Sequence, residues 1–253
     1  MDLLVVGAGA MGRWFAAAVA DGSADPVAVA FADADPAAAK AAADEVGGSV
    51  VDEAGDDRFD AVCVAVPIPA AASAVESYAP RARRAMLDVT GSMADPVAAM
   101  RGAAPDRERV SLHPLFAPEN APGNVAVVAD DPGPVSDAIR AALETRGNRL
   151  FETSAAEHDR TMETVQAGAH AAVLAFGLAA DDVPDEFQTP VSEALFDVLR
   201  QVTGGDPRVY ADIQQTFDGA ADVAAAARRV ADADGETFER LYEEARPGTG
   251  PPR

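Results

Sequence analysis

Lysine and cysteine are almost absent from this chain of 253 residues. Lys40 is its only lysine and Cys63 its only cysteine, so the sequence allows neither an internal disulfide nor a metal site built from cysteines. Lysines and arginines together number 20 against 42 aspartates and glutamates, which gives a formal net charge of −22. Such a chain repels nucleic acids and anionic membranes, which excludes both as partners.

The acidity, the missing lysines and the abundant alanines together are typical of a protein adapted to molar salt. At about 1 M salt, repulsion between carboxylates is screened within about 3 Å. An acidic protein from a GC-rich mesophile is the alternative to this halophilic interpretation.

Long apolar runs are missing as well. The longest, residues 169–180, is too short to span a bilayer and contains His170. The chain starts with Met-Asp-Leu-Leu-Val-Val-Gly, which leads into a strand pattern without the basic segment of a signal peptide. These features predict a cytoplasmic protein.

The first 152 residues alternate short apolar runs with alanine-rich stretches. Strands are predicted at 3–6, 27–32, 61–66, 85–89, 110–112, 125–129 and 148–151, and helices near 10–20, 36–46, 70–79, 95–103 and 133–146. This alternation is typical of an α/β fold, a parallel, doubly wound sheet of the Rossmann type with helices on both faces.

From residue 153 onward the strand pattern stops. An apolar stripe at helical spacing runs from Met162 to Phe176, and further helices are predicted near 189–203, 207–217 and 221–246. We therefore expect an all-α domain over 153–246, followed by a disordered tail at 247–253. The alanine-rich faces of such a domain favour burial against a second copy, which predicts a homodimer.

A nucleotide-binding motif follows the first predicted strand. Gly7, Gly9 and Gly12 have the G-x-G-x-x-G spacing and lie between a strand and a helix, as this motif requires. Gly7 permits a tight turn, Gly9 lets a pyrophosphate approach the backbone, and Gly12 lets the helix pack against the sheet. The N–H groups of Ala10 and Met11 favour the phosphates. A glycine turn that serves packing alone is the alternative.

The cofactor is predicted from the next two strand ends. Asp33 ends the second predicted strand, about twenty residues after the glycines, where a carboxylate bonds the ribose 2′-hydroxyl of NAD. No basic residue follows it closely, so NAD is favoured over NADP. Ala65, Val66 and Pro67 end another strand and are predicted to line the nicotinamide half.

One of the three histidines is placed where a base would be useful. His113 follows the run at 110–112 on the carboxyl edge of the sheet, where ligands bind, and Pro114 restricts its backbone. A free imidazole can accept the proton of an alcohol near neutral pH. By position alone, His113 is equally a loop histidine without a chemical role. Ser92 follows the run at 85–89, where it can bond a substrate hydroxyl or simply form a turn.

Three segments, HPLFAPE, AEHDRTMETVQAGAH and GGDPRVYADI, resemble the prephenate dehydrogenases of the TyrA type. The resemblance runs from the glycine motif to near residue 218 and implies an N-terminal Rossmann domain, a helical dimerisation domain and NAD as cofactor. The implied reaction is the oxidative decarboxylation of prephenate to 4-hydroxyphenylpyruvate in tyrosine biosynthesis. No mutase segment precedes residue 1 and no regulatory domain follows, so we expect the single-function form.

By this resemblance His113 is the catalytic histidine and Ser92 its partner hydroxyl. His170 corresponds to a histidine that contacts the substrate, with a core histidine as the alternative, and His158 is interpreted as structural. The sequence departs from the family at Ala94, where a lysine is often found.

A dianionic substrate requires a local cation in so acidic a chain, and Arg200 is the candidate, with Asp197 one turn before it. An ungapped count places the family's arginine on Gln201, and a surface arginine is the alternative. Glu119 is expected to gate the pocket, to pair with Arg200, or to have no role.

Three other functions fit parts of the sequence. Arogenate dehydrogenase performs the same chemistry on an amino side chain. β-Hydroxyacid dehydrogenases share the domain plan but use a lysine of the helical domain, whereas Lys40 lies in the first domain. A non-catalytic NAD-binding sensor would not need Ser92, His113 and His170.

Overall fold

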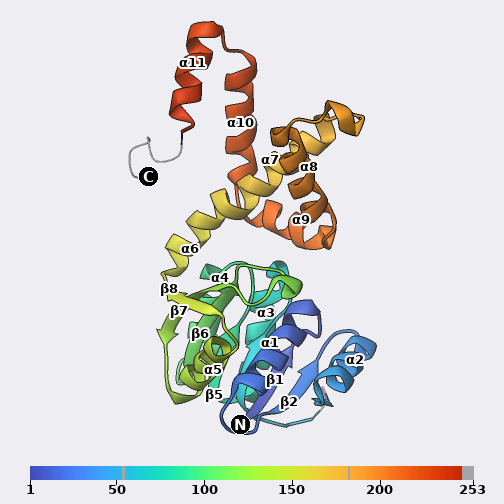
Figure 1. Cartoon of the computed structure of the whole chain (residues 1–253). Helices are drawn as coiled ribbons and strands as arrows, with labels where there is room; N and C mark the ends of the chain where they lie inside the picture. The colour runs from blue at the N-terminus through green and yellow to red at the C-terminus, as the bar shows by residue number, and fades with distance from the viewer. Residues whose placement is uncertain (53–54, 182, 247–253) are drawn as a thin grey trace. The chain divides into compact units, whose positions relative to one another are not determined.

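Strands and helices alternate through the first of two units, Met1–Thr161 (Figure 1). The computed structural model describes residues 1–52, 55–181 and 183–246. Within the described part of this unit, eight strands form one sheet in the order β3-β2-β1-β4-β5-β6-β7-β8. The strands are β1 (Asp2–Val6), β2 (Ala28–Ala32), β3 (Ser49–Val50), β4 (Phe59–Val64), β5 (Ala82–Asp88), β6 (Glu108–Pro114), β7 (Asn124–Asp131) and β8 (Arg149–Glu152). The helices are α1 (Ala10–Gly22), α2 (Pro36–Val46), α3 (Ala71–Tyr78), α4 (Ala94–Ala103), α5 (Pro134–Thr145) and α6 (Ala155–Met162).

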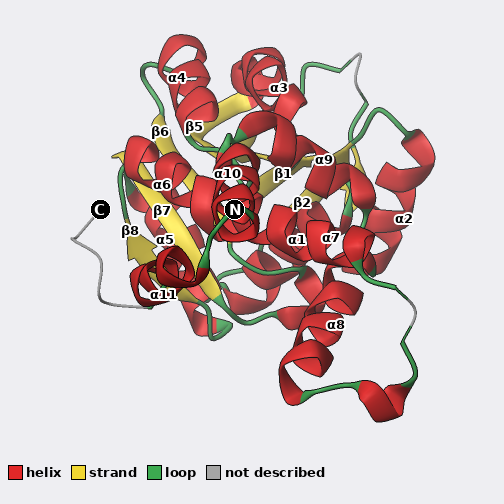
Figure 2. Cartoon of the chain, turned by 90° about the horizontal axis from the view of Figure 1, so that it is seen from above, coloured by secondary structure: helices red, strands yellow, loops and turns green. Residues whose placement is uncertain are grey.

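The helices cover both faces of the sheet, which confirms the doubly wound prediction (Figure 2). On one face, Val5 and Leu87 pack with Phe15 of α1 and Ile139 of α5. On the other face, Met86 packs with residues of α3 and α4. Because side chains alternate along a strand, each buried strand is apolar on both sides and reads as a continuous apolar run.

The sheet is mostly parallel, as predicted, but β7 departs from this pattern and pairs antiparallel with β6. The connection from Pro114 to Asn124 contains only the short 3₁₀ turn η3 (Pro118–Asn120). A parallel pairing needs a crossover of about a dozen or more residues, so this connection can only reverse the chain. The short edge strand β3 pairs with β2 and was not predicted.

The second unit, from Met162 onward, is helical in its described part. The π-helical turn η4 (Glu163–Gly168) leads into α7 (Ala169–Ala179), and η5 (Asp185–Phe187), α8 (Pro190–Thr203) and α9 (Pro207–Thr216) follow. The helix predicted at 221–246 is instead two helices, α10 (Gly219–Ala231) and α11 (Gly235–Glu244). Asp234 caps α11 by accepting a hydrogen bond from the Thr237 N–H, which starts a new helix.

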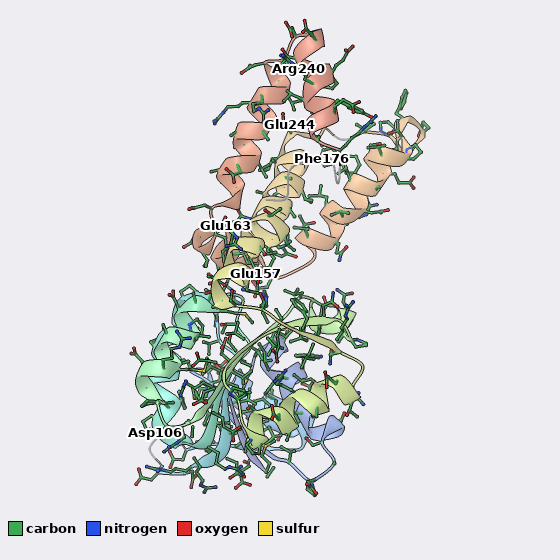
Figure 3. All side chains as sticks on the ribbon, turned by 90° about the vertical axis from the view of Figure 1, so that its left-hand side faces the viewer. Asp106, Glu157, Glu163, Phe176, Arg240 and Glu244 are labelled. Carbon is green, nitrogen blue, oxygen red and sulfur yellow. The ribbon has the colours of Figure 1, made fainter. Side chains whose placement is uncertain are left out.

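Specific contacts hold the second unit together. Phe176 of α7 packs edge-on against Phe196 of α8, with ring centroids 5.1 Å apart. Arg229 of α10 pairs with Glu244 of α11 at 2.8 Å, and Figure 3 labels Glu244. No helix in the described ranges is long and apolar enough to cross a membrane.

The division between the units lies after Thr161, beyond the predicted domain boundary at residue 152. Helix α6, except for its last residue Met162, belongs to the first unit, where Asp159 accepts hydrogen bonds from the backbone of Met93 and Ala94 at 3.0 Å each. The predicted tail at 247–253 lies outside the described residues.

Candidate active site

The glycine turn between β1 and α1 is built so that side chains are excluded. Gly7 has φ +103°, and a Cβ atom there would lie 2.2 Å from the Ala65 carbonyl oxygen. A Cβ atom on Gly12 would lie 2.0 Å from the Gly7 carbonyl oxygen. Gly9 is different: it is exposed, and a Cβ atom there would have no neighbour within 4 Å. The turn is therefore closed on the protein side and open at Gly9.

The start of α1 carries no competing acceptor. Its N-cap Gly9 provides no side-chain hydrogen bond, and its first turn contains no acidic residue. The amide groups of Ala10 and Met11 begin this helix, so its positive end is left for an anion.

Asp33, just after β2, lies against the same turn. Its carboxylate accepts hydrogen bonds from the N–H groups of Ala8, at 2.7 Å, and Asp35, at 2.8 Å. On the opposite side of the turn, Val66 would contact a Cβ atom on Gly7 at 3.2 Å, and Pro67 follows it at the surface. The structure therefore brings the ends of β2 and β4 to the glycine turn, as the sequence predicted.

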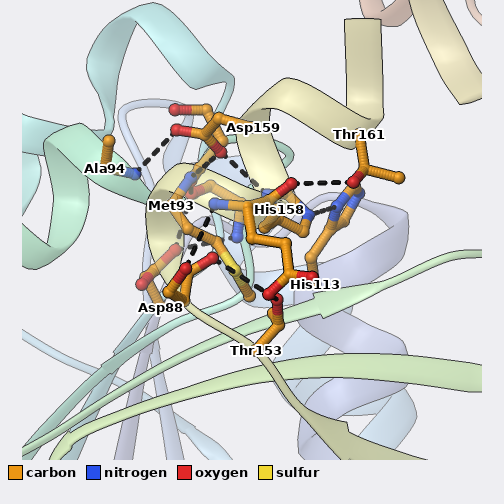
Figure 4. Close-up of polar contacts among 12 residues, drawn as sticks. Asp88, Met93, Ala94, His113, Thr153, His158, Asp159 and Thr161 are labelled. Carbon is orange, nitrogen blue, oxygen red and sulfur yellow. Dashed lines mark hydrogen bonds and ion pairs between the residues drawn. The ribbon is translucent and has the colours of Figure 1, made fainter. Parts of the chain in front are cut away.

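His113 lies near the end of β6 and is almost completely buried. Its Nδ1 is 2.8 Å from Nε2 of His158 on α6, and Nδ1 of His158 is 2.8 Å from Oδ1 of Asp159 (Figure 4). His158 is only 3% exposed. The three side chains form one hydrogen-bonded row from β6 to α6.

The Asp159 carboxylate at the end of this row determines which ring nitrogen of each histidine carries a proton. A carboxylate can only accept, so neutral His158 carries its proton on Nδ1 and accepts at Nε2. His113 must then donate from Nδ1, which places its lone pair on Nε2. A Cβ atom on Gly91 would lie 3.8 Å from that Nε2, so the lone pair faces the turn that contains Ser92.

Burial sets the charge states. Burial and, to a smaller extent, the neighbouring His158 together lower the pKa of His113 to about 3, although Asp159 opposes both. For Asp159, burial raises the pKa, but hydrogen bonds from His158 and from the backbone of Met93 and Ala94 outweigh it and leave the pKa low. His113 is therefore neutral at physiological pH and Asp159 is ionised.

Asp159 also holds the turn after β5. Its Oδ1 accepts from the Met93 N–H and its Oδ2 from the Ala94 N–H, which are the residues just after Ser92. One carboxylate thus ties the histidine pair and the Ser92 turn together, and Figure 4 shows this arrangement. Ser92 itself is buried, with 4% of its surface exposed.

Sequence reasoning placed His113 and Ser92 correctly in one neighbourhood but interpreted His158 as structural and did not single out Asp159. The available signal was the consecutive pair His-Asp near a helix start, in the segment AEHDRTM. Nothing in that local pattern indicates that the helix packs against β6, because the partner histidine is 45 residues away.

Of the other predicted site residues, His170 and Arg200 belong to the second unit and Glu119 to the first. His170 on α7 packs edge-on against Tyr210 of α9, with ring centroids 4.8 Å apart, and burial lowers its pKa. Its Nδ1 is buried without a hydrogen-bond partner among the described residues. Arg200 is exposed and pairs with Asp197 on the same helix. In the first unit, Glu119 is exposed in η3.

Known proteins resemble this chain in sequence and in fold, although no family model matches it. The 4-amino-4-deoxyprephenate dehydrogenase of Streptomyces pristinaespiralis is 36% identical over 210 residues, which cover 74% of this chain and 69% of that protein. The T-protein of Enterobacter agglomerans is 30% identical over 162 residues, which cover 60% of this chain and 43% of that protein.

Among solved structures, prephenate dehydrogenase from Aquifex aeolicus, in complex with hydroxyphenyl propionate and NAD⁺, has a TM-score of 0.72 at 17% identity. The match covers 96% of both chains and shows that the fold is shared. Together with the 36% identity over two thirds of the Streptomyces enzyme, this likeness means that the chain belongs to the prephenate and arogenate dehydrogenase family of the TyrA type.

Proposed function

We propose that this chain catalyses the NAD-dependent oxidative decarboxylation of prephenate to 4-hydroxyphenylpyruvate. The observation that carries the proposal is His113, whose Nδ1 is held by His158 while its Nε2 faces the Ser92 turn. In this reaction a hydride leaves the ring carbon that bears the hydroxyl, the hydroxyl proton goes to a base, and loss of CO₂ produces an aromatic ring. The protein must therefore orient that carbon and accept one proton.

The residues around the glycine turn fit NAD, because the turn excludes side chains at Gly7 and Gly12 but is open at Gly9. The residues that would hold the cofactor are Gly7, Gly9, Ala10, Met11 and Gly12 at the pyrophosphate, Asp33 at the adenosine ribose, and Ala65, Val66 and Pro67 at the nicotinamide half. When bound, NAD supplies the acceptor for the hydride.

The proton follows the row of side chains. His113 accepts the hydroxyl proton at Nε2 and passes the proton of Nδ1 to Nε2 of His158. The positive charge then lies on His158, beside the carboxylate of Asp159. This transfer compensates for the low pKa of His113, because the positive charge moves to the ring that contacts the Asp159 carboxylate. In this scheme His113 is the catalytic residue, Ser92 bonds the hydroxyl, and His158 and Asp159 are positioning residues.

Substrate binding is proposed for three further residues. His170 offers a buried Nδ1 that has no partner in the described part of the chain. Arg200 now pairs with Asp197, and it would bind a substrate carboxylate after releasing that partner. Glu119 is proposed to influence access from its exposed position in η3.

Two related substrates are the second candidates. The Streptomyces relative is named for 4-amino-4-deoxyprephenate, in which an amino group replaces the ring hydroxyl, and its 36% identity favours testing this compound. Arogenate, with an amino group on the side chain, undergoes the same ring chemistry as prephenate. A non-catalytic NAD-binding sensor would bind the cofactor but turn over none of the three.

The test is spectrophotometric. The protein is incubated with NAD in molar KCl, and NADH formation is followed after addition of prephenate, arogenate or 4-amino-4-deoxyprephenate. We expect the fastest turnover with prephenate, and we expect His113→Asn to lower kcat by at least about 10²-fold, the low end for a general base. If none of the three substrates yields NADH, the enzymatic assignment is wrong, and a fully active His113→Asn variant would remove this histidine from the mechanism.

We further propose that the protein is a cytoplasmic homodimer adapted to molar salt. Apolar side chains stay exposed on the helices of the second unit, including Leu178 on α7 at 90% and Val191 on α8 at 71%. A second copy would cover such faces. The charge of −22 supports the salt adaptation, and the lone Cys63 supports a reducing compartment.

A further inference from the structure

A buried carboxyl group lies next to the site without a role in the chemistry proposed so far. Asp88 ends β5 and is fully buried, on the same sheet face as Met86, which packs with Met93 and Val97. Its cross-strand neighbour is Ser111 of β6, which precedes His113 by two residues and therefore faces the same side. Asp88 thus lies beneath the histidine row, in apolar surroundings.

The hydrogen bonds around Asp88 can be satisfied together only if the carboxyl group is protonated. Thr90 Oγ1 lies 2.6 Å from Asp88 Oδ2 and 3.0 Å from the carbonyl oxygen of Ser92, yet the hydroxyl has a single proton. If Asp88 were ionised, the hydroxyl would donate to it and would face the Ser92 carbonyl without a proton between them. If Oδ2 carries a proton, Asp88 donates to Thr90 and Thr90 donates to Ser92.

The second oxygen of Asp88 leads to the same assignment. Asp88 Oδ1 and Ser111 Oγ are both buried without a well-aligned hydrogen-bond partner among the described residues. A full negative charge on such an oxygen would be strongly disfavoured, whereas a neutral carbonyl oxygen is tolerated. The backbone N–H of Thr90, at 3.1 Å from Oδ2, is compatible with either state.

The charged and titratable groups near Asp88 offer no compensation. The charge that acts on it is the negative one of Asp159 on α6, and the nearest titratable group on β4 is the buried thiol of Cys63, whose pKa is itself raised by burial and by Asp88. Burial raises the pKa of Asp88 to about 7, against the lowering effect of the nearby Thr90 and Ser111 hydroxyls. The group therefore changes its charge close to neutral pH.

We propose that Asp88 is a positioning residue that acts as a neutral acid: through Thr90 it holds the Ser92 carbonyl, and so keeps the Ser92 turn against His113. When Asp88 ionises, the Thr90 hydroxyl donates its proton to the Asp88 carboxylate instead of to the Ser92 carbonyl. The Ser92 carbonyl then lacks this hydrogen-bond donor. The same turn is held from the other side by Asp159, so the release is local to residues 90–92. This inference rests on the proposed function only in giving Ser92 a substrate to bind.

The test follows Asp88 directly, so that it does not depend on finding the substrate. The full chain is labelled with ¹³C-aspartate, and NMR follows the carboxyl carbon of Asp88 together with the backbone amides of Gly91 and Ser92 over a pH titration, with and without NAD. We expect the carboxyl carbon to titrate with a midpoint of about 7 and the two amide signals to shift with the same midpoint.

Two variants distinguish a positioning role of Asp88 from a purely structural one. Asp88→Asn keeps a neutral donor toward Thr90, and we expect it to abolish the amide shifts near that midpoint. Thr90→Val removes the intermediate hydroxyl, and we expect it to uncouple the amides while Asp88 still titrates. The exposed Asp106, changed to asparagine, is the matched control and should preserve both titrations.

The proposal is overturned if Asp88 is already ionised well below neutral pH, or if the amide shifts persist in Asp88→Asn. The titration of the unmodified chain decides the first point even if a variant fails to fold. If the NADH assay succeeds, kcat of the wild type should decline above neutral pH. The Asp88→Asn variant should not show this alkaline decline. If the NADH assay fails while the titration succeeds, the proposed function is wrong but the protonation of Asp88 stands.

Discussion

Replacing Asp159 by asparagine tests the geometry of the site most directly. The carboxylate accepts three hydrogen bonds, from His158 Nδ1 at 2.8 Å and from the N–H groups of Met93 and Ala94 at 3.0 Å each. An asparagine has nearly the same shape but only one acceptor oxygen. Its amide N–H₂ must therefore face at least one of these donors.

Both orientations of the new amide carry a cost. If its oxygen faces His158 and Met93, the N–H₂ group opposes the Ala94 N–H. An unsatisfied buried donor costs about 1–3 kcal/mol, and the 22% exposure of the Asp159 side chain favours the lower end. If the N–H₂ group faces His158 instead, that ring must accept at Nδ1 and carry its proton on Nε2. His113 then accepts at Nδ1, its proton moves to Nε2, and the base is lost.

The expected result in turnover is a fall in kcat of about 10²- to 10⁴-fold, the contribution of a general base. NADH formation at saturating substrate and NAD measures it, and thermal unfolding gives the stability loss separately. Glu157→Gln on the same helix is the matched control, because Glu157 is exposed and bonds Thr153 rather than the histidine row. A kcat for Asp159→Asn within about twofold of the wild type would refute the assignment of the His113 proton, since the wrong tautomer costs far more than that.

The remaining predictions concern stability and the cofactor. Burial raises the pKa of Asp88 from 3.8 to about 7, so the folded state holds a proton that the unfolded state releases, and stability falls as pH rises through this interval. The total is at most about 4 kcal/mol, and urea unfolding at acidic and alkaline pH should show the decline in the wild type but not in Asp88→Asn. Gly12→Ala places a methyl group 2.0 Å from the Gly7 carbonyl oxygen, so we expect NAD to change the fluorescence of Trp14, the only tryptophan, in the wild type but not in this variant. Gly219→Ala places a methyl group 1.8 Å from the Glu163 carbonyl oxygen and should lower Tm, whereas Gly235→Ala, with no neighbour within 4 Å, should not. Transfer from molar to millimolar KCl should reduce the helical circular dichroism signal, and an unchanged spectrum would contradict the salt adaptation.

The sequence predicted those features whose cause is local. Gly7 is required by the positive φ of +103° in the turn, and Gly12 is required because any side chain there would collide with the Gly7 carbonyl oxygen. The alternation of apolar runs with helical stretches predicted the order of strands and helices, since a strand buried on both faces must be apolar throughout. His113 was found because it follows a buried strand and precedes a proline.

Other features were decided by tertiary structure. The direction of β7 depends on the length of one connection, and an apolar run looks the same in either direction. The break between α10 and α11 was missed although Asp234 supplies a local cap signal, because the apolar spacing continues on both sides of it.

At the candidate site, the row His113–His158–Asp159 and the neutral state assigned to Asp88 show the same difference between what the sequence determines and what the tertiary structure decides. The amino-acid sequence by itself determined that a histidine follows an apolar run, that a His-Asp pair lies near a helix start, and that an aspartate lies at the end of an apolar run. Only the packing of α6 against β6 brought His158 within 2.8 Å of His113, and only complete burial disfavours the charge of Asp88. Hydrophobic patterning specifies which face of an element is buried, whereas the partner of a polar side chain depends on which distant element covers it.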